Sequence, residues 1–122
     1  MSRENLKELC ENYFKVWSSK DIDGLAKLFA NDVHLQDWEQ SADGIFKVLE
    51  ANKKIFDSTE KLSVFVNNLH YDPSCPWKVV CDITVKINDG VEGKLVEMLP
   101  VIDMISFNDD DKIDFISAYR GF

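Results

Sequence analysis

The sequence predicts an α+β domain in which three amino-terminal helices pack on a curved, mainly antiparallel sheet. Two observations predict this class. Up to about residue 56, apolar residues recur every three or four positions, which is typical of helices with one buried face. After residue 59 they come in β-branched and aromatic runs separated by short polar turns. Because no linker or internal repeat interrupts the 122 residues, we expect a single domain over residues 1–122.

The helical half begins with an amphipathic stretch at residues 4–17. A second, shorter helix is predicted over residues 22–29, with Asp21 as its amino-terminal cap. A third helix should run to about residue 56, capped by either Ser41 or Asp43. The first two helices should therefore form a hairpin.

The strands are predicted from alternation of side chains. A turn at Asn31 and Asp32 should lead into a short strand at residues 33–38. The later strands are expected at residues 62–71, 77–87, 94–107 and 112–119. The turns between them contain Asp, Asn, Pro and Gly, at residues 72–73, 88–90 and 108–111. These four strands should form an antiparallel meander.

Both faces of the later strands carry apolar residues. Ile116 and Ala118 alternate with Phe115 and Tyr119 in the last predicted strand. Helices on one face of the sheet would leave the other apolar face exposed. We therefore expect a homodimer that covers the outer sheet face.

Charge and hydropathy exclude several classes of partner. The formal net charge of -8 and the pI near 4.6 would repel phosphate backbones, so we expect no nucleic acid partner. No apolar stretch approaches the roughly 20 residues that span a bilayer, and the amino terminus lacks the apolar part of a signal peptide. We expect a cytoplasmic protein without a membrane partner.

The cysteines and histidines indicate neither a disulfide framework nor a metal centre. Cys10, Cys75 and Cys81 are an odd number without a CxxC pair, so we interpret them as reduced packing residues. His34 and His70 have no second ligand at metal-binding spacing. We expect no metal and no other cofactor.

Three polar residues occupy positions where apolar ones are expected. Asp37 is in phase with core residues of the short strand, and Asp103 lies in the middle of a long apolar strand. Tyr13 lies on the buried stripe of the first helix, so its hydroxyl needs a partner in the interior. Two carboxyls in apolar surroundings drive their pKa values apart, which leaves one protonated donor beside one anionic acceptor. The three residues predict a pocket that can hold an acid and a base.

Each of these residues also has a simpler interpretation. Asp37 would end its strand in water, Asp103 would mark a register shift near Pro100, and Tyr13 would be an ordinary core residue with a satisfied hydroxyl. Arg120 would then be a solvated residue near the end of the chain.

Residues 13–32 followed by Asp37, together with residues 100–107 and the acidic turn after them, resemble the nuclear transport factor 2-like superfamily. The similarity is greatest to its SnoaL-like and ketosteroid isomerase-like members and extends over nearly the whole chain. It implies a cone-shaped, cystatin-like α+β barrel. It also implies that Asp37 is a general base and that Tyr13 and protonated Asp103 stabilise a dienolate oxygen.

Two residues depart from the ketosteroid isomerase-like pattern. Glu50 occupies the position of a tyrosine that orders the oxyanion donors, and Arg120 replaces an aromatic wall residue. Arg120 could pair with Asp37 or Asp103, or receive an anionic substrate. We therefore expect a pocket more polar than a steroid site, whose ligand-binding residues are Trp17, Glu50, Asn52, Ile105, Ile116, Ala118 and Arg120.

The resemblance leaves three functions open. The first is a cofactor-independent isomerase, cyclase or lyase that removes a proton next to a carbonyl of a small, mostly apolar molecule. The second is a non-catalytic, dimeric scaffold or small-ligand carrier that uses the same cavity. The third is hydrolysis by an Asp-Arg-Asp arrangement, as in some epoxide hydrolases of the superfamily.

Overall fold

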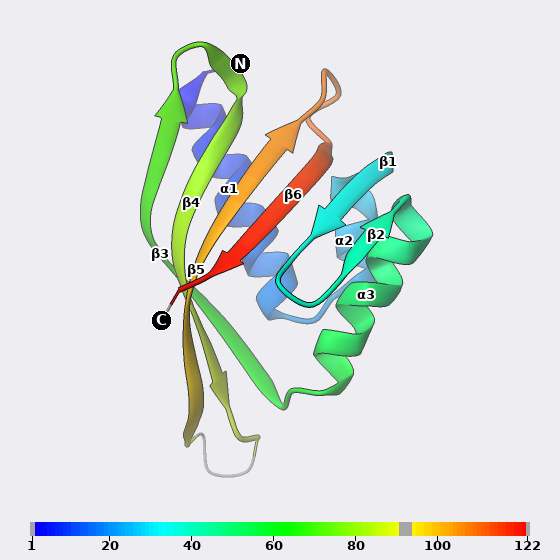
Figure 1. The fold of residues 1–122 in the computed structure, drawn as a ribbon, viewed down its shortest axis with the longest axis vertical. Coiled ribbons are helices and arrows are strands. Elements are labelled where there is room, and N and C mark those ends of the chain that lie inside the picture. Colours follow the sequence, from blue (N-terminus) through cyan, green and yellow to red (C-terminus); the bar gives the residue numbers. More distant parts are fainter. Residues whose placement is uncertain (1, 91–93, 122) are drawn as a thin grey trace.

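The computed structural model describes residues 2–90 and 94–121, so part of the predicted turn after residue 88 lies outside the described residues. Along the chain the elements are α1 (Arg3–Ser18), α2 (Ile22–Leu28), β1 (Phe29–Gln36), β2 (Ser41–Asp43), α3 (Ile45–Asp57), β3 (Lys61–Asp72), β4 (Cys75–Asn88), β5 (Leu95–Phe107) and β6 (Ile113–Arg120) (Figure 1). The predicted α+β class, with three helices and a mainly antiparallel sheet, is confirmed.

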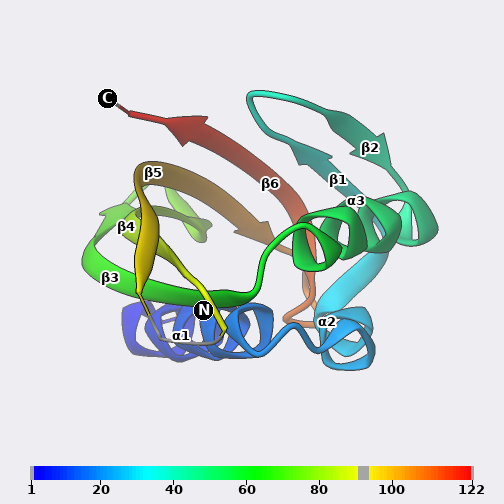
Figure 2. The same ribbon diagram turned by 90° about the horizontal axis from the view of Figure 1, so that it is seen from below.

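The described strands form one sheet in the order β2-β1-β6-β5-β4-β3. Strands β3 to β6 are the predicted antiparallel meander, and β1 joins its edge by pairing parallel to β6. The sheet is strongly curved, with α1 packed against β3 and β4 and α3 packed against β1 and β2 (Figure 2). The three helices and the inner sheet face enclose the core.

Side-chain caps define the first two helices. Ser2 Oγ accepts a hydrogen bond of 3.1 Å from the backbone N–H of Asn5 at the start of α1. Asp21 Oδ1 accepts one of 2.9 Å from Gly24 N–H, as predicted for α2. A side chain at position 24 would collide with the Asp21 carboxylate, which explains the glycine.

The predicted boundary between the second helix and the first strand is wrong. The helix ends at Leu28, and β1 begins directly at Phe29 without a turn at Asn31 and Asp32. Phe29 still donates its N–H to Leu25, but its backbone is extended and pairs with Ile113 of β6. The boundary is therefore set by pairing with a strand far away in the sequence, and the local spacing of apolar residues carries no information about that pairing.

The predicted caps of the third helix are also wrong. Ser41 and Asp43 belong to the short strand β2, which pairs antiparallel with β1. The capping position is Gly44, whose φ of 87° lies in the left-handed region that favours glycine, and no side chain caps the helix.

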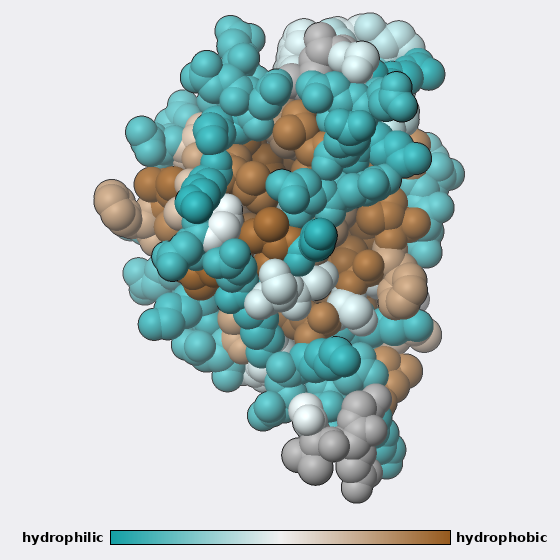
Figure 3. Space-filling view, turned by 180° about the vertical axis from the view of Figure 1, so that it is seen from behind, coloured by the Kyte–Doolittle hydropathy of each residue, from teal (hydrophilic) through white to brown (hydrophobic). Residues whose placement is uncertain are grey.

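The two faces of the sheet differ in exposure. The inner face is buried under the helices, whereas large apolar residues of the outer face are at least one-third exposed: Phe65, Met98, Ile102, Phe115 and Tyr119. The side opposite that of Figure 1 is mostly hydrophilic around its rim, with hydrophobic residues visible in the middle (Figure 3). Among the described residues, no helix combines the length and apolarity needed to span a bilayer.

Candidate active site

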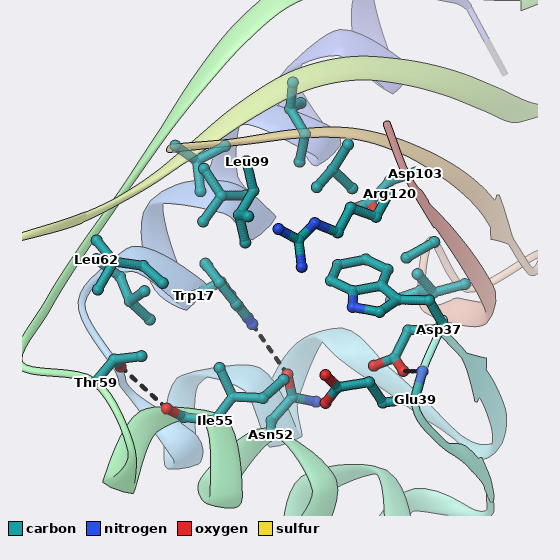
Figure 4. Close-up of a pocket in the computed structure, with 18 of the residues that line it drawn as sticks. Trp17, Asp37, Glu39, Asn52, Ile55, Thr59, Leu62, Leu99, Asp103 and Arg120 are labelled. Atoms are coloured by element: carbon teal, nitrogen blue, oxygen red, sulfur yellow. Dashed lines mark hydrogen bonds between the residues drawn. The ribbon is translucent and has the colours of Figure 1, made fainter. Parts of the chain in front are cut away.

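A cavity of about 270 Å³ lies between the inner sheet face, α1 and α3. Its lining combines apolar side chains with Tyr13, Asp37, Asp103 and Arg120 (Figure 4). This volume lies just below the range of roughly 300–1,000 Å³ for small-molecule sites, so the cavity suits a small ligand. The structure therefore brings the three predicted catalytic residues to one cavity.

Eight of the ten predicted site residues line this cavity: Tyr13, Trp17, Asp37, Asn52, Asp103, Ile116, Ala118 and Arg120. Glu50 is not among the lining residues, because it lies on the exposed side of α3 while Asn52 is buried. Ile105 follows Asp103 on the same face of β5, but it is fully buried in the core beyond the cavity, opposite Val79 and Ile116.

Asp103 forms the deep end of the cavity. Its residue is only 7% exposed, and it lies in the middle of β5 between Cys81 of β4 and Ala118 of β6. The register between β4 and β5 is continuous past Pro100, so Asp103 does not mark a register shift. Within residues 2–90 and 94–121, its carboxyl makes no hydrogen bond or ion pair. Burial, with a smaller contribution from Asp37, raises the pKa of Asp103 from 3.8 to about 7.

Tyr13 reaches the cavity from the buried face of α1. Its ring packs against Phe14 and Phe29, with centroid separations of 5.2 and 6.2 Å. Burial and the negative charge of Asp103 raise the pKa of the phenol well above its ordinary value. Tyr13 is therefore a protonated hydrogen-bond donor at neutral pH, and its hydroxyl has no hydrogen-bond partner in the described part of the chain.

Asp37 occupies the mouth of the cavity, one residue beyond the end of β1. Its Oδ1 accepts hydrogen bonds of 2.8 Å from the N–H groups of both Glu39 and Gln40. Its Oδ2 accepts a longer one of 3.4 Å from Gln40 Nε2. These donors hold the carboxylate in a tight turn while it remains half-buried at the cavity wall.

One wall of the cavity is fixed by a hydrogen bond between two helices. Trp17 Nε1 of α1 donates to Asn52 Oδ1 of α3 over 3.0 Å, and Asn52 Nδ2 donates to Val48 O (Figure 4). Asn52 is only 3% exposed, and these two hydrogen bonds satisfy both the oxygen and the nitrogen of its buried amide. This bond orients the Trp17 indole along the cavity.

The mouth also contains residues that the sequence analysis missed. The first is Glu97, whose Oε1 lies 3.3 Å from Nη2 of the predicted residue Arg120, so the two side chains form an ion pair at the rim. Glu97 shares the face of Asp103 on β5, and strand alternation could have found it. Trp38 and Glu39 line the mouth from the turn after β1, where no periodic pattern indicates direction.

No cluster of three or more His, Cys, Asp or Glu side chains in the described residues is arranged to hold a metal ion. The site presents two hydrogen-bond donors at the deep end, since Tyr13 and protonated Asp103 can both donate, and a carboxylate at the mouth.

No protein-family model and no curated protein matches the sequence. Solved structures do match. A protein with a ketosteroid isomerase-like fold from Catenulispora acidiphila, in complex with trimethylamine, is 13% identical, with a TM-score of 0.76 over 92% of this chain and 84% of that one. A nuclear transport factor 2-like protein from an Exiguobacterium species is 15% identical, with a TM-score of 0.77 over 93% and 98%.

An LEH-like epoxide hydrolase of M. tuberculosis is 13% identical, with a TM-score of 0.74 over 93% of this chain and 80% of that chain. SnoaL-like proteins are also among the matches. The chain therefore has the nuclear transport factor 2-like fold, as the sequence predicts. Since proteins of this fold carry different activities, the function has to be argued from the site.

Proposed function

We propose that this protein is a cofactor-independent isomerase, cyclase or lyase that abstracts a proton next to a carbonyl of a small, mostly apolar substrate. One observation carries the proposal: the buried Asp103 carboxyl, with a pKa of about 7, lines the same cavity as Tyr13 and Asp37. This arrangement supplies a base and two oxyanion donors in a largely apolar space.

In the proposed mechanism, the carboxylate of Asp37 removes the proton from the carbon next to the carbonyl. The electron pair of the broken C–H bond moves toward the carbonyl oxygen and forms an enolate. Tyr13 and protonated Asp103 stabilise that oxygen by donating hydrogen bonds. In an isomerase, Asp37 then returns the proton to another carbon. In a cyclase, the enolate carbon forms a bond to a second carbonyl carbon and Asp37 gives the proton to the alkoxide that results. In a lyase, the bond to a β-substituent breaks and Asp37 gives the proton to that leaving group.

Hydrogen–deuterium exchange at the α-carbon tests proton abstraction without knowledge of the product. A panel of small ketones and enones is incubated with the protein in D2O and followed by NMR. We expect exchange with the native protein and a roughly 100- to 10,000-fold slower rate with Asp37→Asn. The exposed hairpin variant Asp109→Asn is the matched control. Absence of exchange across the whole panel would sink the proposal.

The second candidate is a non-catalytic small-ligand-binding protein. It is favoured by the three hydrogen bonds that the Asp37 carboxylate accepts within its own turn, because these hold the side chain in place and occupy acceptor positions that a catalytic base would use. Tight binding without deuterium exchange would establish this function. The Asp-Arg-Asp hydrolase is not proposed, since Arg120 pairs with Glu97 and with neither aspartate.

We also propose a homodimer formed through the outer sheet face. The exposed side chains of Met98, Ile102, Phe115 and Tyr119 support it, because together they form an apolar surface on one side of the sheet. Sedimentation at micromolar concentration should show about twice the chain mass of 14.0 kDa, and Ile102→Lys should halve it. A native protein that sediments only as a single chain would contradict the dimer.

The cytoplasm is the proposed compartment. The three cysteines of the chain are free thiols, which supports a reducing environment. Fractionation of the source cells with an antibody against the protein would test this assignment.

A further inference from the structure

The mouth of the cavity carries more negative charge than the protein neutralises. Asp37, Glu39 and Glu97 line the cavity near its mouth, and Arg120 is the cation among the described lining residues. Arg120 is engaged by Glu97 at 3.3 Å. Asp37 and Glu39 form no ion pair in the described part of the chain, so no cation of the protein balances their negative charge there.

Aromatic rings accompany these carboxylates. Trp38 lines the mouth between Asp37 and Glu39 in sequence, and it is 45% exposed. Deeper in the cavity, Trp17 is held by its bond to Asn52. Carboxylates next to aromatic faces favour an organic cation, because both the charges and the ring quadrupoles attract it. The net charge of -8 of the whole protein also attracts a cation over a longer range.

The deep end of the cavity offers hydrogen-bond donors to a ligand. Asp103 as a residue is 7% exposed, lines the cavity, and makes no hydrogen bond or ion pair within residues 2–90 and 94–121. Tyr13 also lines the cavity, and no residue in 2–90 or 94–121 forms a hydrogen bond with its hydroxyl. Both groups can donate a hydrogen bond into the cavity, so a ligand acceptor such as a carbonyl oxygen fits this end.

We propose that the substrate is a small amino ketone, with its carbonyl oxygen at Tyr13 and Asp103 and its protonated amine at the mouth beside Glu39 and Trp38. This inference rests on the proposed function and adds the amine. Figure 4 shows the carboxylates of Asp37 and Glu39 in the same part of the cavity, away from the labelled Leu62 and Leu99. The apolar middle of the lining would hold the body of the molecule.

Three matched ketones test the charge preference by isothermal titration calorimetry at pH 7. They are 4-(aminomethyl)acetophenone, which is cationic, 4-(hydroxymethyl)acetophenone, which is neutral, and 4-acetylbenzoate, which is anionic. We expect the amine to bind about tenfold more tightly than the alcohol and the benzoate to bind most weakly.

The variant Glu39→Gln should remove most of the amine's advantage over the alcohol. Glu8→Gln, on the exposed face of α1, removes the same charge away from the cavity and should leave the preference intact. An equal or tighter affinity for the alcohol or the benzoate, or no binding of any of the three ketones, would overturn the amino-ketone proposal.

The outcomes separate this inference from the proposed function. Preferential amine binding without α-carbon exchange would contradict the enzyme and retain the amine-binding mouth. Exchange of neutral ketones without any amine preference would retain the enzyme and contradict the amino ketone.

Discussion

Asp37 and Asp103 line one cavity in opposite environments. Asp37, at the mouth, is half-buried and accepts hydrogen bonds from the turn that it begins. Asp103, at the deep end, is buried without a partner, and burial raises its pKa to about 7. The difference shows how a protein can obtain a hydrogen-bond acceptor and a donor from the same residue type, since solvation and hydrogen bonding decide which form is stable.

The largest expected effect is on the pH dependence of stability in Asp103→Asn. The folded-state pKa of about 7 exceeds the ordinary value of 3.8, so the folded protein retains a proton that the unfolded chain releases. The free energy of unfolding of the native protein should therefore fall as the pH rises from 4 to 8. The variant lacks this loss. The free energy of unfolding of the variant, relative to that of the native protein, should therefore grow by on the order of 4 kcal/mol over that range, at about 1.4 kcal/mol per pH unit.

Urea denaturation at a series of pH values measures this difference. Asp109→Asn, in the exposed hairpin after β5, is the matched control and should follow the native curve. Parallel curves for native protein and Asp103→Asn would show that the deep end does not hold a proton.

An intermediate effect is expected from Asn52→Leu, which alters the wall between the two ends. The Trp17 indole N–H loses its acceptor inside the protein, and this should lower the free energy of unfolding by roughly 1–3 kcal/mol. Near-UV circular dichroism should show a change in the tryptophan signal. Asn12→Leu, on the exposed face of α1, should change stability by less than about 0.5 kcal/mol. Equal stability of the two variants would contradict a structural role for the bond.

The smallest effect is expected at the mouth. Asp37→Asn keeps an Oδ1 acceptor for the N–H groups of Glu39 and Gln40, so stability should change by less than about 0.5 kcal/mol. Asp37→Ala removes all three hydrogen bonds that this side chain accepts and should cost about 1 kcal/mol. Denaturant titration compares the two variants, and an alanine variant as stable as the asparagine variant would mean that the turn does not depend on this side chain.

The sequence predicts the deep end better than the mouth. Strand alternation places Asp103 on the core face, and helical periodicity places Tyr13 on the buried face of α1, because regular elements determine where side chains point. Alternation also placed Asp37 on the side of Leu35, and both line the cavity. Trp38 and Glu39 follow in a turn, where direction depends on local hydrogen bonds that no period encodes.

Misplaced boundaries in the fold have the same origin. The early start of β1 depends on its pairing with β6, which lies far away in the sequence. The strand β2 is only three residues long and depends on its pairing with β1. Glu50 was assigned to the site from resemblance alone, and it lies on the exposed side of its helix. A site residue inferred from resemblance to a remote family should therefore also lie on the helix face that points toward the cavity.

The raised pKa of Asp103 is tested most directly by a carbon-13 NMR titration of its carboxyl, assigned by comparison with Asp103→Asn. We expect a pKa of about 7 in the native protein. In Asp37→Asn the pKa should be lower, because one nearby negative charge is removed, but still raised by burial. Titration of Asp103 near 3.8 in the native protein would contradict the proposed donor at the deep end of the cavity.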